Sequence, residues 1–415
     1  MRALTARRFA APRLALAAAA LLLAPGLLAA GPAAAQDLKI GVVNPYSGPM
    51  ALYGDEMTRG YDIAVEQANA KGGVLGRKIA VIRGSATSAQ EAIAAVEQLI
   101  GRDKVDLLSG TYVTAISNAA SEAALNNGKL FWETNALSKD LTDRSLPNFA
   151  RSGPDSVAFA RRSVEGVLEL VIPKLGKQPK DVKVWIEHED TSFGTSIGKE
   201  QERLLKAAGV QVSIGSHSAR AIDLSDSILR AKNAAPDLWL STGYVIDHNL
   251  LLRTMREQSF RPAAVMLVGT GDTPETLDAV GKDALNGVLL VSYPRADVGE
   301  SYGPGAGAFL AAYKAKYNRD PIAPQAMSAY VGMKILLQAI ADAKSTEYEK
   351  VVAAAAKMDK PFGTYETGYG VKFDGTMQNT RALPLIAQWQ DGQVRAVFPK
   401  EAQPAGVTLM DLARK

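Results

Sequence analysis

Residues 38–73 read LKIGVVNPYSGPMALYGDEMTRGYDIAVEQANAKGG, and this stretch decides the fold class. It starts with a short apolar run, which predicts a strand over 38–42. After a loop with Pro and Gly, apolar side chains recur at helical spacing at Met57, Tyr61, Ala64 and Ala68. The segment Lys71-Gly72-Gly73 is expected to end this helix. A strand, a loop and a helix in this order form the first part of a βαβ unit.

The same alternation of short apolar runs and longer amphipathic ones continues along the chain. Ser88 and Glu91 have the spacing of a capping box, which predicts the start of a helix that buries Ile93, Val96 and Ile100. Other helices are expected to end at Asn127 and Gly209. Further strands are expected over 78–82, 105–109, 130–132, 182–186, 238–241, 264–268 and 287–291. Strands that alternate with helices predict a parallel α/β sheet.

The pattern starts again at residue 182, and a chain of this length exceeds what one core usually supports. We therefore expect an α/β protein with two doubly wound parallel-sheet lobes joined by a multi-crossing hinge. The first lobe is expected to comprise residues 36–152 plus 295–363, and the second 153–294 plus 364–415. The crossings are expected near 152–155, 292–295 and 362–369.

Two features of the C-terminal part refine this expectation. The helical stretches 305–316 and 325–343 have no strands of their own, so they are expected to pack back on the first lobe. Asp391-Gly392 lies between the apolar runs 385–389 and 394–398, which is typical of a β-hairpin. Ligands of open α/β sheets bind beyond the carboxyl ends of the strands, so the loops there are the places to search for a site.

The N-terminus has the pattern of a secretory signal peptide. Four arginines and no acidic residue precede an uncharged stretch over 14–30, and Ala33-Ala34-Ala35 fits a signal-peptidase site before Gln36. A membrane anchor is the alternative, but the apolar run is short and contains Pro25 and Gly26. The sequence predicts cleavage after Ala35 and a periplasmic product without a stable membrane anchor.

Charge and cysteine content exclude several classes of function. Without the four arginines of the first 35 residues, 43 basic residues face 43 acidic ones. A formally neutral chain gives no support to nucleic-acid binding. The sequence contains no cysteine, which excludes disulfides, thiolate metal sites and a lipid anchor on cysteine. No metal and no cofactor are expected.

Residues 40–73 also carry a specific resemblance. The strand, Ser47-Gly48-Pro49, Tyr53-Gly54-Asp55 and the helix end at 69–73 resemble the opening of the Leu/Ile/Val-binding protein family. A weaker likeness covers most of the remaining chain: 110–121, 140–142, 192–194, 242–244 and Tyr330. The resemblance implies a type I periplasmic binding fold that captures a small-molecule solute by lobe closure and delivers it to an inner-membrane ABC permease, acting as a monomer.

The resemblance also implies positions for the ligand site. Thr114 falls where a hydroxyl residue holds the ligand carboxylate, with a plain helix N-cap as the alternative. Asn135 and Ala136 fall where main-chain groups contact the ligand. Tyr53, Tyr112 and Tyr244 fall on positions of the pocket wall, with packing in the core or the hinge as the alternative. The ligand that the family implies is a branched-chain or another apolar amino acid.

Three positions depart from the family pattern. Leu137 replaces a threonine, Phe193 replaces a tyrosine, and Gly271 replaces the acid that binds the ligand ammonium. Either the adjacent Asp272 or Glu133 is expected to take over that role. If neither does, the ligand is an aromatic or aliphatic carboxylate or a short amide without an α-ammonium, because an unpaired buried ammonium is costly.

Glu133 follows the apolar residues Phe131-Trp132 at the end of an expected buried strand, where a lone carboxylate needs partners. It either pairs with a basic residue or with backbone N–H groups, or it faces the ligand. In the last case Trp132 would stack on an apolar or aromatic ligand.

Several short segments resemble enzyme motifs. Residues 194–198 match G-x-S-x-G around Ser196, and Asp247 and His248 follow in hydrolase order. Residues 188–193 separate the motif from its strand, whereas a nucleophile elbow turns abruptly from strand to helix. The segment His188-Glu189-Asp190 is too compact for a preformed metal site, and Gly269-Thr270-Gly271 lacks the third glycine of a nucleotide-binding loop. We therefore do not expect the protein to be an enzyme. A ligand sensor with the same fold stays an alternative to a transport protein.

Overall fold

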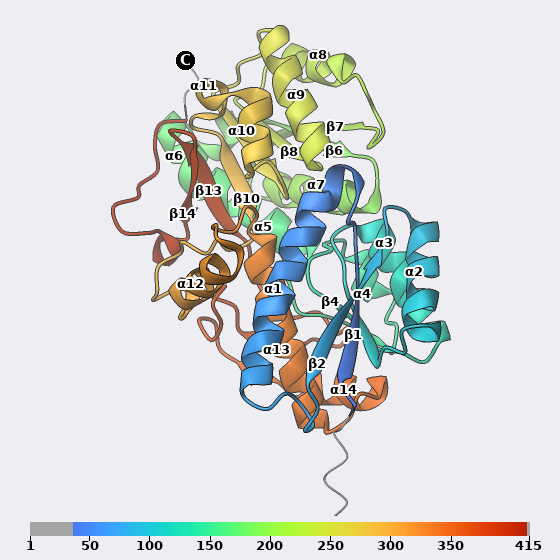
Figure 1. Ribbon diagram of the computed structural model, residues 1–415. Helices are drawn as coiled ribbons and strands as arrows, with labels where there is room; N and C mark the ends of the chain where they lie inside the picture. The colour runs from blue at the N-terminus through green and yellow to red at the C-terminus, as the bar shows by residue number, and fades with distance from the viewer. Residues whose placement is uncertain (1–35, 413–415) are drawn as a thin grey trace, which may run out of the picture. The chain divides into compact units, whose positions relative to one another are not determined.

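A computed structural model describes residues 36–412, so the predicted signal peptide lies outside the described residues. The described chain contains two sheets of five and seven strands (Figure 1). The first sheet has the order β2-β1-β3-β4-β5 and is parallel throughout. Its strands are β1 (Leu38–Asn44), β2 (Ile79–Ser85), β3 (Leu107–Gly110), β4 (Phe131–Glu133) and β5 (Phe149–Arg151).

Helices cover both faces of the first sheet because side chains alternate along its strands. Ile40 and Val42 point toward α1 (Ala51–Ala70), whereas Val43 packs in the cluster formed with α2 (Ala89–Gly101) and α3 (Thr114–Asn126). Figure 1 shows α1 beside α13 (Gln325–Ala343). A Cβ atom at Gly60 would lie 2.0 Å from the Ala326 carbonyl oxygen, so only glycine allows these two helices to approach so closely.

The second sheet has the order β14-β13-β10-β9-β8-β6-β7. Its parallel strands are β6 (Lys183–Glu189), β7 (Gln211–His217), β8 (Leu238–Thr242), β9 (Ala264–Val268) and β10 (Leu289–Ser292). The hairpin β13 (Leu385–Gln390) and β14 (Gln393–Phe398) adds two antiparallel strands. Asp391 and Gly392 have φ of 51° and 80°, which is the left-handed turn that the sequence predicted.

The helices around the second sheet are α5 (Ser156–Gly166), α6 (Ile172–Leu175), α7 (Ser192–Ala207), α8 (Ser225–Ala234), α9 (Val245–Glu257), α10 (Pro274–Val280) and α11 (Lys282–Leu285). A π-helical turn, Val167–Val171, connects α5 to α6. Short helical segments complete the order: α4 (Asp140–Asp143) and 3-10 turns at Gly48–Met50, Pro179–Asp181 and Lys400–Ala402. The predicted α/β class with two parallel-sheet units is confirmed, and the antiparallel hairpin extends the second sheet.

The helices α12 (Ala306–Tyr317) and α13 pack on α1 of the first sheet, as expected, and α14 (Tyr348–Ala355) packs on α13. The Tyr313 hydroxyl donates to Glu56 of α1 at 2.8 Å, and Tyr330 donates to Gln67 at 2.8 Å. A small sheet of β11 (Asp359–Lys360) and β12 (Val371–Lys372) follows. The loop after β12 bonds to β5, since the N–H of Asn379 donates to the Arg151 carbonyl at 2.9 Å. The limits of the two lobes stay a prediction.

One expectation about α2 was wrong. Ile93 is 42% exposed and Ile100 is only half-buried, whereas Val96 is buried as expected, together with Ala92 and Leu99. Ser88 is the N-cap and accepts the N–H of Glu91, but the Glu91 carboxylate bonds to Thr87 and not to Ser88. In a capping box the Glu91 carboxylate would accept the N–H of the N-cap residue. Here it bonds instead to Thr87, the residue before the N-cap.

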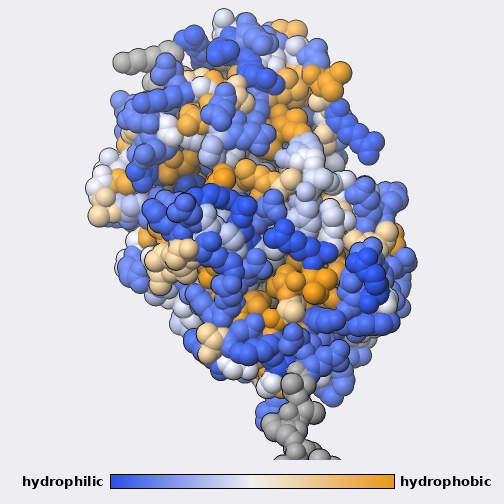
Figure 2. All heavy atoms as spheres, viewed as in Figure 1, coloured by the Kyte–Doolittle hydropathy of each residue, from blue (hydrophilic) through white to orange (hydrophobic). Residues whose placement is uncertain are grey.

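The surface agrees with the composition. Hydrophilic side chains predominate on the face seen in Figure 2, and the hydrophobic ones form small scattered patches. Among residues 36–412 we find no helix that is long and apolar enough to span a bilayer.

Candidate functional site

Four aromatic rings meet beyond the carboxyl ends of strands from both sheets. Tyr112 follows β3 of the first sheet, and Tyr244 follows β8 of the second and caps α9. Their ring centroids lie 6.1 Å apart with the rings edge to face. Tyr53 of α1 stacks on Tyr112 at 4.4 Å, and Phe193 of α7 lies 4.9 Å from Tyr244. The predicted wall residues Tyr53, Tyr112 and Tyr244 thus form one cluster with Phe193.

The cluster encloses a cavity of only about 10 Å³. It is lined by Tyr112, Asn135, Leu137, Phe193, Tyr244, Gly269 and Tyr293. No charged side chain is in this set, and the space suffices for about one water molecule. A solute can therefore enter only if the rings or the two sheets move apart.

Asn135 supplies the polar side chain of this cavity. Asn135 is 1% exposed. Neither its Oδ1 nor its Nδ2 atom has a hydrogen-bond partner among the described residues. Its carbonyl oxygen accepts the Tyr293 hydroxyl. An unpaired buried amide is unfavourable, so the side chain is available to a ligand with both a donor and an acceptor.

Glu133 does not face this cavity. Its Oε1 atom accepts the backbone N–H groups of Thr111, Thr134, Asn135 and Ala136 at 2.7–2.9 Å. Its Oε2 atom accepts the hydroxyls of Thr111 and Ser117. Burial raises the pKa of the carboxyl, and the donated hydrogen bonds oppose that shift. Glu133 therefore pairs with backbone N–H groups, which was one of the alternatives that the sequence left open.

The hydrogen bonds to Glu133 limit which groups of Asn135 and Ala136 can bind a ligand. The N–H groups of Asn135 and Ala136 are engaged by Glu133, so only other groups of these residues are free for a ligand. Ala136 is buried and does not line the cavity. Trp132 donates from Nε1 to Ser152 at 3.1 Å and packs on Phe373, away from the cavity. Trp132 does not line the aromatic cavity, and its stacking on a ligand stays a prediction.

Thr114 is the first residue of α3 and is buried, while Val113 occupies the N-cap position. The plain N-cap alternative for Thr114 is therefore wrong. Thr114 does not line the aromatic cavity either. Its expected contact with a ligand carboxylate stays a prediction.

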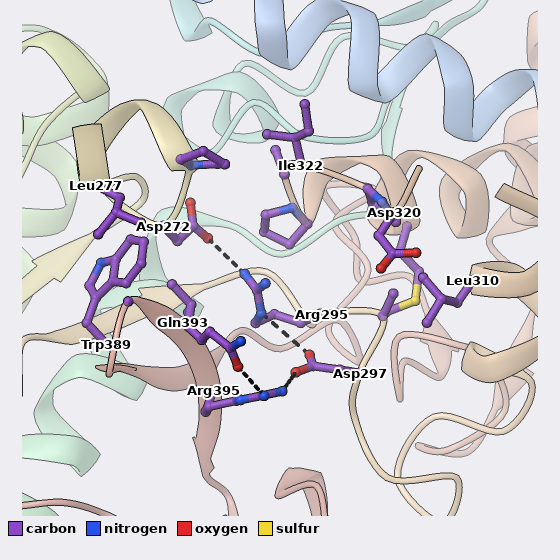
Figure 3. Close-up of a pocket in the computed structure, with 18 residues that line it drawn as sticks. Asp272, Leu277, Arg295, Asp297, Leu310, Asp320, Ile322, Trp389, Gln393 and Arg395 are labelled. Atoms are coloured by element: carbon purple, nitrogen blue, oxygen red, sulfur yellow. Dashed lines mark hydrogen bonds and ion pairs between the residues drawn. The ribbon is translucent and has the colours of Figure 1, made fainter. Parts of the chain in front are cut away.

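Asp272 lies at a second, larger pocket of about 510 Å³ (Figure 3). Gly271 has φ of 100°, and a Cβ atom there would meet the Leu267 side chain at 2.6 Å. This backbone conformation disfavours the acid that the family pattern has at this position. Burial raises the pKa of Asp272, and Arg295 and Ser292 oppose the shift. Asp272 is thus close to Arg295 and shares no cavity with Phe193 and Tyr244.

Sequence reasoning missed several residues of these sites, among them Tyr293, Gly269 and Arg295. Tyr293 and Gly269 line the aromatic cavity, and Arg295 lies beside Asp272 in the larger pocket. Two of them belong to the predicted crossing 292–295. That position was a signal for Tyr293 and Arg295, because ligands of two-lobed proteins bind next to the hinge.

The hydrolase motif is not assembled. Residues 194–198 lie within α7, and Ser196 donates to the Phe193 carbonyl of the same helix at 3.0 Å. His248 lies 2.8 Å from Thr270 through Nδ1, and burial lowers its pKa to about 3. The Asp247 carboxylate accepts the N–H of Tyr244 as part of a helix cap.

The compact acidic segment at the end of β6 has a structural role. Glu189 accepts the N–H groups of Thr191 and Gly194 at 2.6 Å each, at the start of α7. Among the residues that the structure describes, no group of three His, Cys, Asp or Glu side chains is placed to hold a metal ion.

Comparison with known proteins assigns the family. The model of the periplasmic binding protein family matches residues 37–393. The chain is 38% identical over 385 residues to Leu/Ile/Val-binding protein homolog 7 of Brucella suis biovar 1 (strain 1330), covering 92% of this chain and 96% of that protein. It is 36% identical to homolog 8 of Brucella abortus (strain 2308), with 89% and 92% covered.

Solved structures share the fold. The leucine binding protein LivK of Thermotoga maritima matches with a TM-score of 0.75 and 21% identity, over 86% of this chain and 97% of that one. A solute binding protein of an ABC transporter from R. palustris, in complex with 4-hydroxybenzoate, matches with a TM-score of 0.74 and 21% identity, over 89% and 98%. The chain therefore belongs to the periplasmic binding protein family, in its branched-chain amino acid transporter group.

Proposed function

We propose that this protein is the periplasmic solute-binding component of an ABC importer and that it captures a branched-chain or another apolar amino acid between its two lobes. The observation that carries the proposal is the meeting of Tyr112 and Tyr244, which bring the strand ends of two sheets together around Asn135. A site with walls from two units closes on its ligand, and the difference in affinity between closed and open forms drives that motion.

The chemistry of the cavity favours an apolar ligand body. Aromatic faces from Tyr112, Phe193 and Tyr244 bury apolar surface without requiring a charge on the ligand. The Asn135 carboxamide offers one donor and one acceptor group. Together these groups suit a compact solute with an apolar side chain and a polar end.

A second candidate is an aromatic or aliphatic carboxylate, or a short amide, without an α-ammonium. Two observations favour it: the residues lining the aromatic cavity are uncharged, and Gly271 stands where the family carries an acid. The R. palustris protein named above was solved with 4-hydroxybenzoate, which has no ammonium.

The permease partner and the compartment complete the proposal. After cleavage at Ala35, the exported monomer would dock its closed form on an inner-membrane permease through both lobes. A sensor that signals to another protein from the same closed form is the alternative. Loss of solute uptake after deletion of the gene would support transport, and unchanged uptake with loss of a ligand response would support sensing.

A thermal-shift series on the exported protein tests the ligand class. A ligand at about 100 times its Kd stabilises the native state by about 2.7 kcal/mol, which gives a clear rise in Tm. Leucine, isoleucine and valine are expected to raise the Tm, and 4-hydroxybenzoate serves as the ligand without an ammonium. A rise with 4-hydroxybenzoate alone would replace the first candidate by the second.

A further inference from the structure

A separate pocket of about 360 Å³ lies where α9 packs on α10, and its volume is in the range of small-molecule sites. Its lining residues lie within two stretches, 252–261 and 280–284, and it is called the α9/α10 pocket below. The first stretch holds the C-terminal part of α9 and the loop that follows, and the second holds the end of α10 and the start of α11 (Figure 1). All of these elements belong to the second sheet.

The α9/α10 pocket and the aromatic cavity lie at opposite ends of the same elements. Tyr244 is the N-cap of α9, whereas Arg256 is in its last turn. At the rise of an α-helix, residues 244 and 256 are about 18 Å apart along the axis. Strand β9 repeats this relation, since Phe260 precedes it and Gly269 follows it. The two sites share no lining residue, so a solute in the aromatic cavity does not occupy the α9/α10 pocket.

Cations predominate among the side chains that line the α9/α10 pocket. Three of them are basic, Arg256, Arg261 and Lys282, and one is acidic, Asp283. Lys282 lies 3.6 Å from Asp391, which is outside the lining set. Both arginines are exposed, and among residues 36–412 we find no ion pair or hydrogen bond of either guanidinium group. These two cations are therefore available to an anion.

The remaining side chains of the pocket are apolar. Leu252, Phe260 and Val280 are 2–5% exposed and belong to the hydrophobic core, so they form a fixed floor. No uncharged polar side chain is in the lining set. A ligand recognised here thus gains little from neutral hydrogen-bonding groups, and its affinity depends on charge and on an apolar body.

We propose that the α9/α10 pocket binds a small organic dianion, a phosphate monoester, through the guanidinium groups of Arg256 and Arg261, with the apolar body of the ligand on Phe260. A planar guanidinium matches two phosphate oxygens at once, and the three terminal oxygens of a phosphoryl group serve two arginines. A phosphate monoester carries a charge of about −1.5 to −2 at pH 7, which compensates the positive excess of the lining residues. This site is distinct from the proposed solute site and does not depend on it.

Titration calorimetry on the exported protein tests the proposal, with phenyl phosphate at pH 8 as the probe. Arg256→Gln and Arg261→Gln are each expected to raise its Kd at least about tenfold, because each removes a charge-assisted contact. Asp283→Asn removes the acid of the lining set and is expected to lower the Kd about threefold. Phenyl sulfate has nearly the same shape with a single negative charge, and it is expected to bind at least about tenfold more weakly.

The matched control is Arg253→Gln, which removes an exposed arginine of the same helix that does not line the pocket. Its Kd for phenyl phosphate is expected to stay within about twofold of the parent. Unfolding midpoints verify that each variant folds, and the gain expected for Asp283→Asn does not depend on the arginine variants.

Three outcomes would overturn the proposal. The first is an equal loss of affinity in Arg253→Gln, Arg256→Gln and Arg261→Gln, which would mean that only the general charge of α9 attracts the probe. The second is an equal Kd for phenyl phosphate and phenyl sulfate. The third is the absence of phenyl phosphate binding up to about 10 mM.

Discussion

The Tyr112 and Tyr244 rings meet edge to face at 6.1 Å, with an angle of 64° between their planes. Tyr112 follows a strand of the first sheet and Tyr244 a strand of the second. This contact is therefore a direct measure of how closely the two sheets approach at the site. Edge-to-face pairs contribute about 0.5–1.5 kcal/mol beyond the area that they bury.

Tyr244→Ala is expected to weaken solute binding at least about tenfold, because it removes an aromatic wall from the cavity. Tyr244→Phe keeps the ring and is expected to retain affinity within about threefold. Calorimetric titration with the solute found in the thermal-shift series measures both. Equal loss in the two variants would show that the hydroxyl, and not the ring, carries the interaction.

Glu133 is expected to stabilise the loop that carries Asn135. Glu133→Gln removes the charge from a buried acceptor of six hydrogen bonds and is expected to lower the free energy of unfolding by about 1–3 kcal/mol. Glu133→Ala removes all six bonds and is expected to cost more than about 4 kcal/mol. Urea unfolding measures both values. Glu122→Gln, an exposed acid paired with Arg144, is the control and is expected to change stability by less than about 0.5 kcal/mol.

Arg151 is expected to hold β5, the 136–142 loop and the loop after β12 together. Its buried guanidinium donates to Gln378 Oε1 at 2.5 Å and to the carbonyls of Ala136 and Ser138 at 3.0 and 2.8 Å. Arg151→Met leaves these acceptors buried and unpaired, so we expect a loss of about 3–5 kcal/mol in the free energy of unfolding. A loss below about 1 kcal/mol in urea unfolding would contradict this role.

Periodic segments made the fold predictable. The apolar run at 38–42 and the helical spacing from Met57 to Ala68 depend on local sequence alone, so their elements and the second set after residue 182 were found correctly. The exposure of Ile93 was missed because a helix with apolar residues on several sides does not reveal which side packs. The side of α2 that is buried is determined by its packing against the neighbouring helix α3.

The site was predictable only in part, for a physical reason. Tyr112 and Tyr244 follow strands, and strand ends of a parallel sheet are known to face the ligand. The capture of the Asn135 and Ala136 N–H groups by Glu133 depends on how the loop after β4 curls around the carboxylate. In the loop after β9, Gly269 lines the aromatic cavity whereas Asp272 lines the larger pocket. Neither feature leaves a periodic signal in the sequence.

Two adjacent residues of α9 are expected to affect the pH dependence of stability in opposite directions. Burial, followed by the charge of His217, lowers the pKa of His248 from 6.5 to about 3. The folded state thus keeps the imidazole neutral, while the unfolded chain binds a proton below about pH 6.5. The stability that His248 contributes is complete above that pH and is lost as the pH falls toward 3. At about pH 4.5 the loss amounts to about 3 kcal/mol.

Burial raises the pKa of Asp247, which reverses the sign. The folded state binds this proton more tightly than the unfolded chain, so Asp247 favours folding at low pH and loses that contribution as the pH rises through its folded pKa. His248→Gln is therefore expected to flatten the decline of stability between about pH 7 and pH 4.5, and Asp247→Asn to steepen it. Urea unfolding at both pH values measures the slopes. Parallel profiles for His248→Gln and the parent protein would mean that the imidazole is protonated in the folded state, and that Thr270 and the surrounding backbone solvate a charge at this buried position.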